Sequence, residues 1–381
     1  MQRMPLLHSR RGFLKDVAGA SAGIFFTSCC GLVDSAMGWM QSPAPARRRE
    51  VVIGGRRALT VDIHTHVIIP EALEIAKAHT GSQQIRNQLA SAVGPNYDVH
   101  NADSRVARMD REGIDVQALS ANPWWYWAER NLAREIVQAT NEQIAKLCAA
   151  HPDRFVGFAA VALQHPDMAA EQLEEGMKNL GMRGCAIAGS VNGEELSAPK
   201  FHPFWAKAEQ LGALVFMHPQ GFLEARERLQ GNGWLTNVIG QPLETTVALS
   251  HLIFEGTLDR FPALKICAAH AGGFLPSYIG RSDACLTAQP DNCKPVQKKP
   301  SEYLRHLYFD SLVFNSEGLR HLVAVAGSNQ VVLGTDSPTQ WNPRGVDHIL
   351  ETPGLSDDDR RAILGGNAAK LLRMDLPPRR R

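Results

Sequence analysis

Short apolar runs alternate along this chain with segments whose apolar residues recur at helical spacing. The runs are rich in Val, Ile, Leu, Ala, Phe and Cys, which is typical of parallel strands buried on both faces. Eight such runs occur: Ala58 to Ile63, Val116 to Leu119, Phe155 to Val161, Cys185 to Ala188, Leu214 to Met217, Lys265 to Ala269, Leu307 to Phe309 and Val331 to Leu333.

The segments between the runs carry the spacing of amphipathic helices. One stripe consists of Leu173, Met177 and Leu180 and is followed by Gly181, where a glycine is the expected helix stop. Strands that alternate with helices predict a parallel sheet with right-handed crossovers, and eight of them predict a closed (β/α)8 barrel. We place this barrel at residues 57–376. A doubly wound open sheet is the alternative, but it would not bring together the ends of the first, fifth, sixth and eighth strands.

Five polar side chains stand at the ends of those four strands: His64, His66, His218, His270 and Asp336. Because the carboxyl ends of barrel strands meet at one face, these side chains are expected to converge. His64 and His66 are two residues apart and so point to the same side of a strand. Imidazoles with one carboxylate suit Zn²⁺, with Mn²⁺, Fe²⁺ or Co²⁺ as alternatives. The pattern predicts one divalent metal ion.

Zinc commonly takes four protein ligands, so one of the five candidates is expected to move protons instead. We assign this role to His270, since Ala271, Gly272 and Gly273 follow it and small residues let a substrate approach. A divalent ion with an open position can activate water or polarise a substrate oxygen.

The bulk composition narrows the class of protein. The 381 residues are 44% hydrophobic and 21% charged, with a formal net charge of +1, which is typical of a globular chain. Nothing predicts a nucleic-acid-binding face, which would need a basic stripe, and the arginines that end the chain read as a solvated tail.

The first residues predict export. Ser9 to Lys15 reads SRRGFLK, a match to the twin-arginine signal, and an apolar stretch from Val17 to Phe26 follows. We therefore interpret residues 1–46 as a signal peptide and linker, with the twin-arginine machinery as a partner and the periplasm as the destination. Cleavage after Ala46 would give a soluble product, whereas a lipid anchor at Cys29 is the alternative. After export, Cys285 and Cys293 are close enough in sequence to pair.

Three further segments leave alternatives open. The poorly patterned stretch from Pro70 to Asn101 follows the first strand and is either a lid over the site or a surface excursion. The aromatic run from Trp124 to Trp127 cannot all face one core, so part of it is expected to line a pocket or an interface, with a dimer contact or a place in the core as the alternative. His251 lies among Leu249, Leu252 and Ile253 and is expected to be a packed core histidine.

The chain resembles the amidohydrolase superfamily, and within it the branch of 2-amino-3-carboxymuconate-6-semialdehyde decarboxylase-like enzymes. The resemblance runs from about Val61 to Leu372. It rests on these blocks: VDIHTH, ARMDREGIDVQALS, DRFVGFAAV, ALVFMHP, GQPLETTVALSHLIFEGTLDRFPALKICAAHAGGFLPSYIGR, VVLGTDSP and GNAAKLL.

The resemblance implies a (β/α)8 barrel that dimerises and binds one divalent metal, commonly zinc, with no organic cofactor. Its metal ligands would be His64, His66, His218 and Asp336, and His270 would be the catalytic acid/base. Arg281 would bind a substrate carboxylate, across the dimer interface in the founding enzyme. The implied activity is decarboxylation of a small aromatic or unsaturated carboxylic acid. Hydrolysis of a lactone, ester or amide on the same centre is the alternative.

The sequence departs from the family pattern around the expected pocket. Gln220 stands where the founding enzyme has a tryptophan, and Ser337 where an aromatic residue is common, although Trp341 follows shortly after. The arginine of the founding enzyme's flap has no counterpart between Val93 and Ala102. These differences put the muconate-semialdehyde substrate itself in doubt.

Overall fold

The computed structural model describes residues 48–79, 98–294, 296–339 and 341–374. The predicted leader at residues 1–46 and most of the predicted lid segment lie outside them. In the part of the chain that is described, no helix is both long and apolar enough to cross a membrane.

Eight parallel strands form a closed barrel, as the alternation predicts. The third strand of the barrel is interrupted at Phe158 and is therefore divided into β5 and β6. β5 pairs with β4, and β6 pairs with β7. The ring closes because Ile63 N donates to Leu333 O at 3.0 Å and His66 N to Ser337 O at 2.7 Å. The strands are β3 (Val61–His66), β4 (Val116–Ser120), β5 (Phe155–Gly157) with β6 (Ala159–Ala160), β7 (Gly184–Ile187), β10 (Leu214–Met217), β11 (Lys265–Ala268), β12 (Tyr308–Asp310) and β13 (Val331–Val332).

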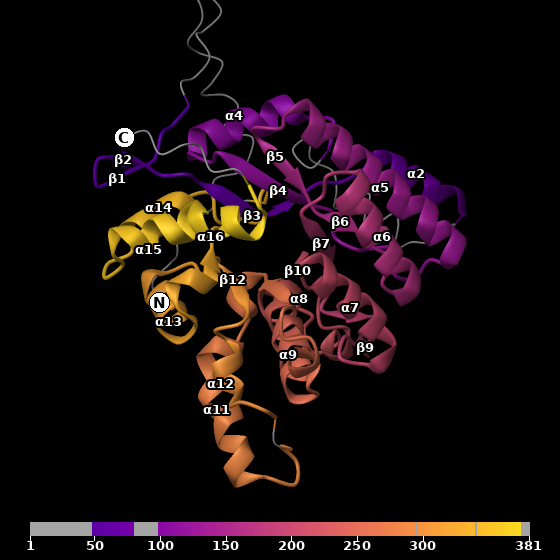
Figure 1. Cartoon of the computed structure of the whole chain (residues 1–381), viewed down its shortest axis with the longest axis vertical. Coiled ribbons are helices and arrows are strands. Elements are labelled where there is room, and N and C mark those ends of the chain that lie inside the picture. The colour runs from indigo at the N-terminus through magenta and orange to yellow at the C-terminus, as the bar shows by residue number, and fades with distance from the viewer. Residues whose placement is uncertain (1–47, 80–97, 295, 340, 375–381) are drawn as a thin grey trace, which may run out of the picture. The chain divides into compact units, whose positions relative to one another are not determined.

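Helices surround this barrel (Figure 1). The longer ones are α2 (Pro70–His79), α4 (Ala102–Glu112), α5 (Arg130–Ala150), α6 (Pro166–Asn179), α7 (His202–Leu211), α9 (Gly240–Phe254), α11 (Leu275–Ala288) and α13 (Ser316–Ala326). The shorter ones are α8 (Leu235–Val238), α10 (Thr257–Arg260), α12 (Pro300–Tyr303), α14 (Gly345–Glu351), α15 (Asp357–Arg361) and α16 (Asn367–Leu371). One apolar core fills the barrel around Ile63, Phe158 and Phe216, and a larger one lies between strands and helices.

Some boundaries differ from the sequence prediction. The first barrel strand begins at Val61 and includes both histidines, whereas we predicted that it spans Ala58 to Ile63. A hairpin of β1 (Val52–Ile53) and β2 (Arg56–Arg57) precedes the barrel and was not predicted, because two-residue strands carry no periodicity. The prediction for His251 is wrong: its side chain is 38% exposed and lies 2.5 Å from Glu255, since it occupies the solvent side of α9.

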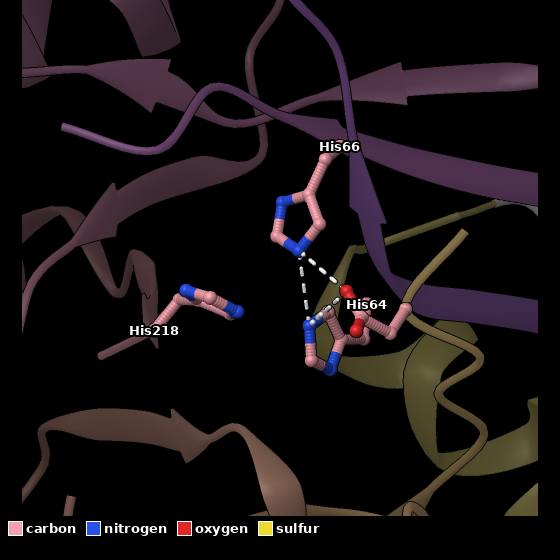
Figure 2. A group of neighbouring side chains, drawn as sticks. His64, His66 and His218 are labelled. Atoms are coloured by element: carbon pink, nitrogen blue, oxygen red, sulfur yellow. Dashed lines mark hydrogen bonds and ion pairs between the residues drawn. The ribbon is translucent and has the colours of Figure 1, made fainter. Parts of the chain in front are cut away.

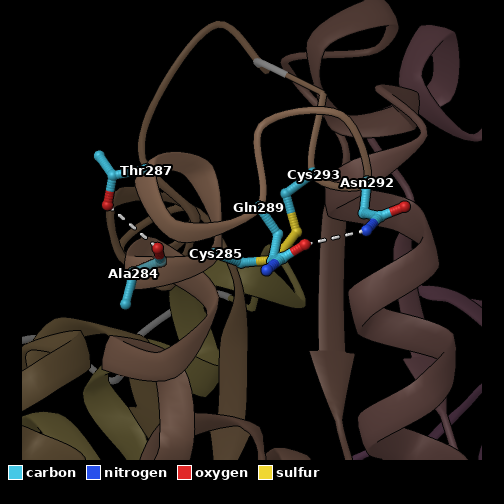
Figure 3. The surroundings of a disulfide bond; sticks show 6 residues. All are labelled: Ala284, Cys285, Thr287, Gln289, Asn292 and Cys293. Carbon is cyan, nitrogen blue, oxygen red and sulfur yellow. Dashed lines mark hydrogen bonds between the residues drawn. A yellow bond between two sulfur atoms is a disulfide. The ribbon is translucent and has the colours of Figure 1, made fainter.

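Cys285 and Cys293 form a disulfide between the last turns of α11 and the loop that follows, as predicted (Figure 3). Within the same loop, the side-chain amide of Asn292 donates to Oε1 of Gln289 at 3.2 Å. The other cysteines of the described region, Cys148, Cys185 and Cys267, are free thiols. The disulfide thus ties the far end of α11 to its connection.

Candidate metal centre and active site

Four of the five predicted residues meet at the carboxyl end of the barrel (Figure 2). His64 and His66 come from the end of β3, His218 follows β10, and Asp336 lies three residues after Leu333, beyond β13. One side-chain ligand atom from each of the four lies within 4.8 Å of the others, and all four residues are buried.

The donor atoms converge on one point. Nε2 of His64 and Nε2 of His66 are 3.1 Å apart, and Oδ1 of Asp336 lies 3.3 Å and 3.0 Å from them. Two ligands bound to one ion at about 2.0–2.1 Å are separated by roughly 3 Å. Nδ1 of His218 is buried without a hydrogen-bond partner in the described structure. The donor set therefore fits one divalent cation.

The charges of the site also favour a cation. Burial alone would lower the pKa of His64, but the carboxylates of Asp336 and Asp310 outweigh it and raise this pKa to about 10. Burial, together with His66 and His64, holds the pKa of His218 well below its usual value, so this imidazole is neutral, as a metal ligand must be. Without a metal ion, the two carboxylates keep His64 protonated and positively charged. A bound metal ion would supply this positive charge in place of the proton.

Asp310 belongs to the site and was missed by the sequence analysis. It ends β12, is fully buried, and its Oδ2 lies 2.6 Å from Nδ1 of His64. The same carboxylate accepts hydrogen bonds from the backbone N–H groups of His270 at 2.9 Å and Ala271 at 2.8 Å. Asp310 therefore orients His64 and fixes the loop that carries His270.

His270 lies beside the cluster, with its ring centroid 5.1 Å from that of His64 and 5.2 Å from that of His218. Burial and the neighbouring His64 lower its pKa to about 4, so its imidazole is neutral near pH 7. Its Nδ1 is buried and has no hydrogen-bond partner in the described region. His270 and Asp336 both adopt left-handed backbone angles, with φ of 52° and 59°. Such conformations cost about 1–3 kcal/mol each and gather at functional sites.

A cavity of about 280 Å³ opens onto His66, His218 and Asp336. Trp124 lines this cavity, whereas Trp125 and Tyr126 are buried in the core. The aromatic run is therefore divided between the pocket and the core. None of the described residues around this cavity is an arginine or lysine. Its remaining walls are neutral: Val67, Ile68, Ile69, Ala72, Ala121, Asn122, Thr140, Trp234, Asn237, Gln241, Thr339 and Trp341.

Glu244 on α9 supports the loop after β10 and was also missed. Its Oε2 accepts hydrogen bonds from the backbone N–H groups of Gln220 at 2.7 Å and Gly221 at 2.6 Å. The side chain is 4% exposed, and burial raises its pKa to about 7. Because Gln220 is two residues beyond His218, Glu244 fixes the backbone that leaves the metal cluster.

Arg281 does not lie at the metal cluster of its own chain. It is exposed on α11 and lines a different cavity, of about 600 Å³, between α9 and α11. Leu243, Phe254, Phe274 and Tyr278 are among the apolar residues that line this second cavity. A role for Arg281 at the metal cluster thus requires a second copy of the chain.

Comparison with known proteins identifies the family. The Amidohydrolase family profile matches residues 61–374. The chain belongs to the amidohydrolase family. It is 32% identical over 335 residues to 2-amino-3-carboxymuconate-6-semialdehyde decarboxylase of Dictyostelium discoideum, covering 84% of this chain and 93% of the relative. It is also 32% identical over 296 residues to the gamma-resorcylate decarboxylase of Rhodococcus jostii strain RHA1, covering 72% of this chain and 88% of that enzyme.

A solved amidohydrolase-family structure shares the fold. Dihydroxybenzoic acid decarboxylase from Polaromonas sp. JS666, with bound manganese and the inhibitor 2-nitroresorcinol, superimposes with a TM-score of 0.70 at 26% identity. The match covers 83% of this chain and 97% of that one. The barrel and its position in the family, both expected from the sequence, are therefore confirmed.

Proposed function

We propose that this protein is a metal-dependent decarboxylase of a small aromatic or unsaturated carboxylic acid. The observation that carries the proposal is the convergence of His64, His66, His218 and Asp336 beside a small cavity whose other described walls carry no charged side chain. The relatives support it, because the named enzymes among them remove carboxyl groups from a muconate semialdehyde or from dihydroxybenzoates.

The cavity walls explain why such an acid needs the metal. A carboxylate that enters this cavity loses its hydration, and the described wall residues of the same chain offer it no cationic side chain in exchange. A divalent ion on the four ligands would hold the oxygens of the acid and balance the negative charge that its carboxylate carries into the cavity. Trp124 and the aliphatic residues of the wall would then contact the ring or diene face.

His270 supplies the proton. Decarboxylation breaks the bond between the ring carbon and the carboxyl carbon, so CO₂ leaves and its bonding electron pair stays on the ring carbon. That carbon must then gain a proton. His270 is neutral before the reaction and lies beside the cluster, so it can take a proton from a bound substrate hydroxyl or water and deliver it to carbon.

We further propose zinc as the resident ion, with manganese as the alternative. Three imidazoles and one carboxylate are a common zinc set. Support for manganese comes from the Polaromonas decarboxylase, whose structure contains that metal. Metal analysis of protein purified without added metal distinguishes the two.

A homodimer is the assembly in which Arg281 could bind the substrate carboxylate at the metal cluster of the other chain. The cavity between α9 and α11 is mostly apolar, and Tyr278 on its rim is 71% exposed. A second copy seated there would cover this surface and could carry Arg281 toward the partner's metal cluster.

Export by the twin-arginine route is the proposed localisation, with the periplasm as the destination. The SRRGFLK segment carries it, and the disulfide between Cys285 and Cys293 supports it, because disulfides persist in oxidising compartments. Replacing Arg10 and Arg11 by lysine and fractionating the cells tests it. The expected result is retention of the precursor in the cytoplasm, and unchanged release would contradict the proposal.

The decarboxylase activity itself is tested by CO₂ release. Protein loaded with zinc or manganese is incubated with 2,6-dihydroxybenzoate and a panel of hydroxybenzoates and dienoic acids. Release that depends on the metal and is lost in Asp336→Ala supports the function. Turnover of a lactone panel, with no release from any acid, would contradict it.

A further inference from the structure

Three exposed aromatic side chains meet at the mouth of the metal cavity: Trp234, Phe314 and Trp341. We call them the outer aromatic cluster. The rings of Trp234 and Trp341 stack with centroids 5.7 Å apart and planes 20° apart, and Phe314 packs against Trp341 at 6.2 Å. Trp234 is 60% exposed, Phe314 58% and Trp341 38%. Within the described part of the chain, the cluster therefore offers solvent an aromatic surface.

Each ring comes from a different loop of the catalytic face. Trp234 lies in the loop after β10, Phe314 follows β12, and Trp341 follows β13. Trp234 and Phe314 adopt left-handed backbone angles, with φ of 49° and 60°. Such angles are unfavourable for bulky side chains and persist where the surrounding structure imposes them. The fold thus holds aromatic rings at an exposed place where both solvation and backbone conformation disfavour them.

The cluster is continuous with the metal cavity. Trp234 and Trp341 line the same cavity as His66, His218 and Asp336. At about 280 Å³ this cavity is at the small end of the range for ligand pockets. It has room for about one carboxylated ring, and a further substituent on that ring can contact Trp234 and Trp341, because both line the cavity.

From this arrangement we infer that the outer aromatic cluster is a specificity subsite for a flat aromatic or apolar substituent of the substrate. The inference rests on the proposed decarboxylase function and adds to it. The preferred substrate is then a phenolic or unsaturated acid with such a substituent on the side opposite its carboxylate. The acid end lies at the metal cluster, and the substituent stacks on Trp341 or Trp234.

A matched pair of inhibitors tests the subsite without turnover. The compounds are 2-nitroresorcinol, in which a nitro group replaces the carboxylate of 2,6-dihydroxybenzoate, and its 5-phenyl derivative, whose phenyl group lies opposite the nitro group. Titration calorimetry on the manganese-loaded full chain gives both dissociation constants. We expect the phenyl compound to bind about tenfold more tightly.

The affinity ratio of the two compounds is the readout in the variants. Trp341→Ala and Phe314→Ala should each reduce the ratio at least about threefold, and Trp341→Phe should keep most of it. Trp127→Ala is the matched control, because Trp127 is 36% exposed but lies outside the cluster, and it should leave the ratio unchanged.

The outcomes separate this inference from the function beneath it. If neither compound binds, the subsite is overturned, and the proposed function fails with it only if no acid of the panel releases CO₂. If 2-nitroresorcinol binds but the phenyl group adds no affinity, or the ratio survives both alanine variants, the subsite is overturned while the function stands. A change of oligomeric state in Trp341→Ala, with the ratio intact, would instead assign the cluster to a contact between chains.

Discussion

Nδ1 of His64 lies 2.6 Å from Oδ2 of Asp310, and both side chains are completely buried. The two residues come from strands β3 and β12, with β13 between them in the barrel. This contact fixes which nitrogen of His64 faces the metal cluster, because Nδ1 is engaged by Asp310 and Nε2 is left to converge with His66 and Asp336. Carboxylates that orient metal-binding histidines in this way also raise their basicity.

Asp310→Asn should therefore weaken metal binding without removing a ligand. The amide keeps the size of the side chain but loses its charge, and it has one acceptor oxygen where the carboxylate serves His64, His270 and Ala271. We expect the metal dissociation constant to rise about 10- to 100-fold. Competition with a chelator measures it.

Asp259→Asn is the control for this substitution. The Asp259→Asn substitution also removes a charged acceptor, because the hydroxyl of Tyr303 donates to Oδ1 of Asp259 at 2.6 Å, but Asp259 lies outside the metal cluster. It should lower the melting temperature without changing metal affinity. Equal metal affinity in Asp310→Asn and wild type would show that Asp310 is only structural.

His270→Asn and Asp336→Ala should separate proton transfer from metal binding. Asp336→Ala removes the oxygen toward which both His64 and His66 point, so metal content per chain should fall severalfold. His270→Asn should keep its metal and lose at least about 100-fold in turnover, the usual loss on removing a general acid or base. Elemental analysis and CO₂ release measure the two effects.

His100→Asn serves as the matched control, because His100 is exposed and pairs with Glu71 at 2.9 Å. It should keep both metal and turnover. Our division of roles is wrong if His270→Asn loses as much metal as Asp336→Ala.

The barrel and the five principal site residues could be read from the sequence because each depends on one local pattern. An apolar run marks a strand, and the polar residue at its end marks the catalytic face. The same rule applies to Asp310, which follows the run from Leu307 to Phe309. A single aspartate after a short apolar run has no second ligand at a recognisable spacing, however, and so does not stand out in the sequence. The boundary of β3 was misplaced because its last residues are polar, although their backbones continue the pairing.

Residues that act through distant contacts could not be predicted. Glu244 lies in a helix whose pattern gives no sign that its carboxylate turns inward to the backbone of Gln220. Trp234 and Trp341 are neighbours only because the barrel brings the loops after β10 and β13 together. Their pairing follows from the closed topology and from no local property of either segment.

Glu244 should make stability depend on pH. Its pKa is about 7 in the folded protein, against the ordinary value of 4.5, so the folded state binds a proton that the unfolded state has released between these values. Unfolding free energy should therefore fall as pH rises from about 4.5 to 7, by up to about 3 kcal/mol, and level off above that.

Glu244→Gln should abolish this component, since the amide is neutral at every pH and still offers an oxygen to the two backbone donors. Urea unfolding of chelator-treated protein at pH 5 and pH 7.5 measures it, because removing the metal removes its own pH dependence. Glu227→Gln, at an exposed glutamate of the neighbouring loop, should behave as wild type. A variant of Glu244 with the same pH slope as wild type would contradict the assignment.

Arg281 should act on the site of a second chain. Arg281 lines the cavity between α9 and α11 and not the cavity at the metal cluster. It therefore does not contact a substrate bound at the metal cluster of its own chain. Arg281→Ala should raise KM for the acid at least about tenfold, as expected for loss of a charged hydrogen bond. If chains pair with two-fold symmetry, a heterodimer of Arg281→Ala with His270→Asn contains one site with both groups intact.

Co-expression with two different tags isolates this heterodimer. It should recover about half of the wild-type kcat/KM per dimer, although Arg281→Ala alone loses at least about tenfold and His270→Asn alone at least about 100-fold in kcat/KM. A pairing in cis predicts no recovery, because each chain then carries its own defect into its own site. Light scattering on the same samples establishes the oligomeric state. A monomer at assay concentration would exclude any route for Arg281 to reach a metal cluster.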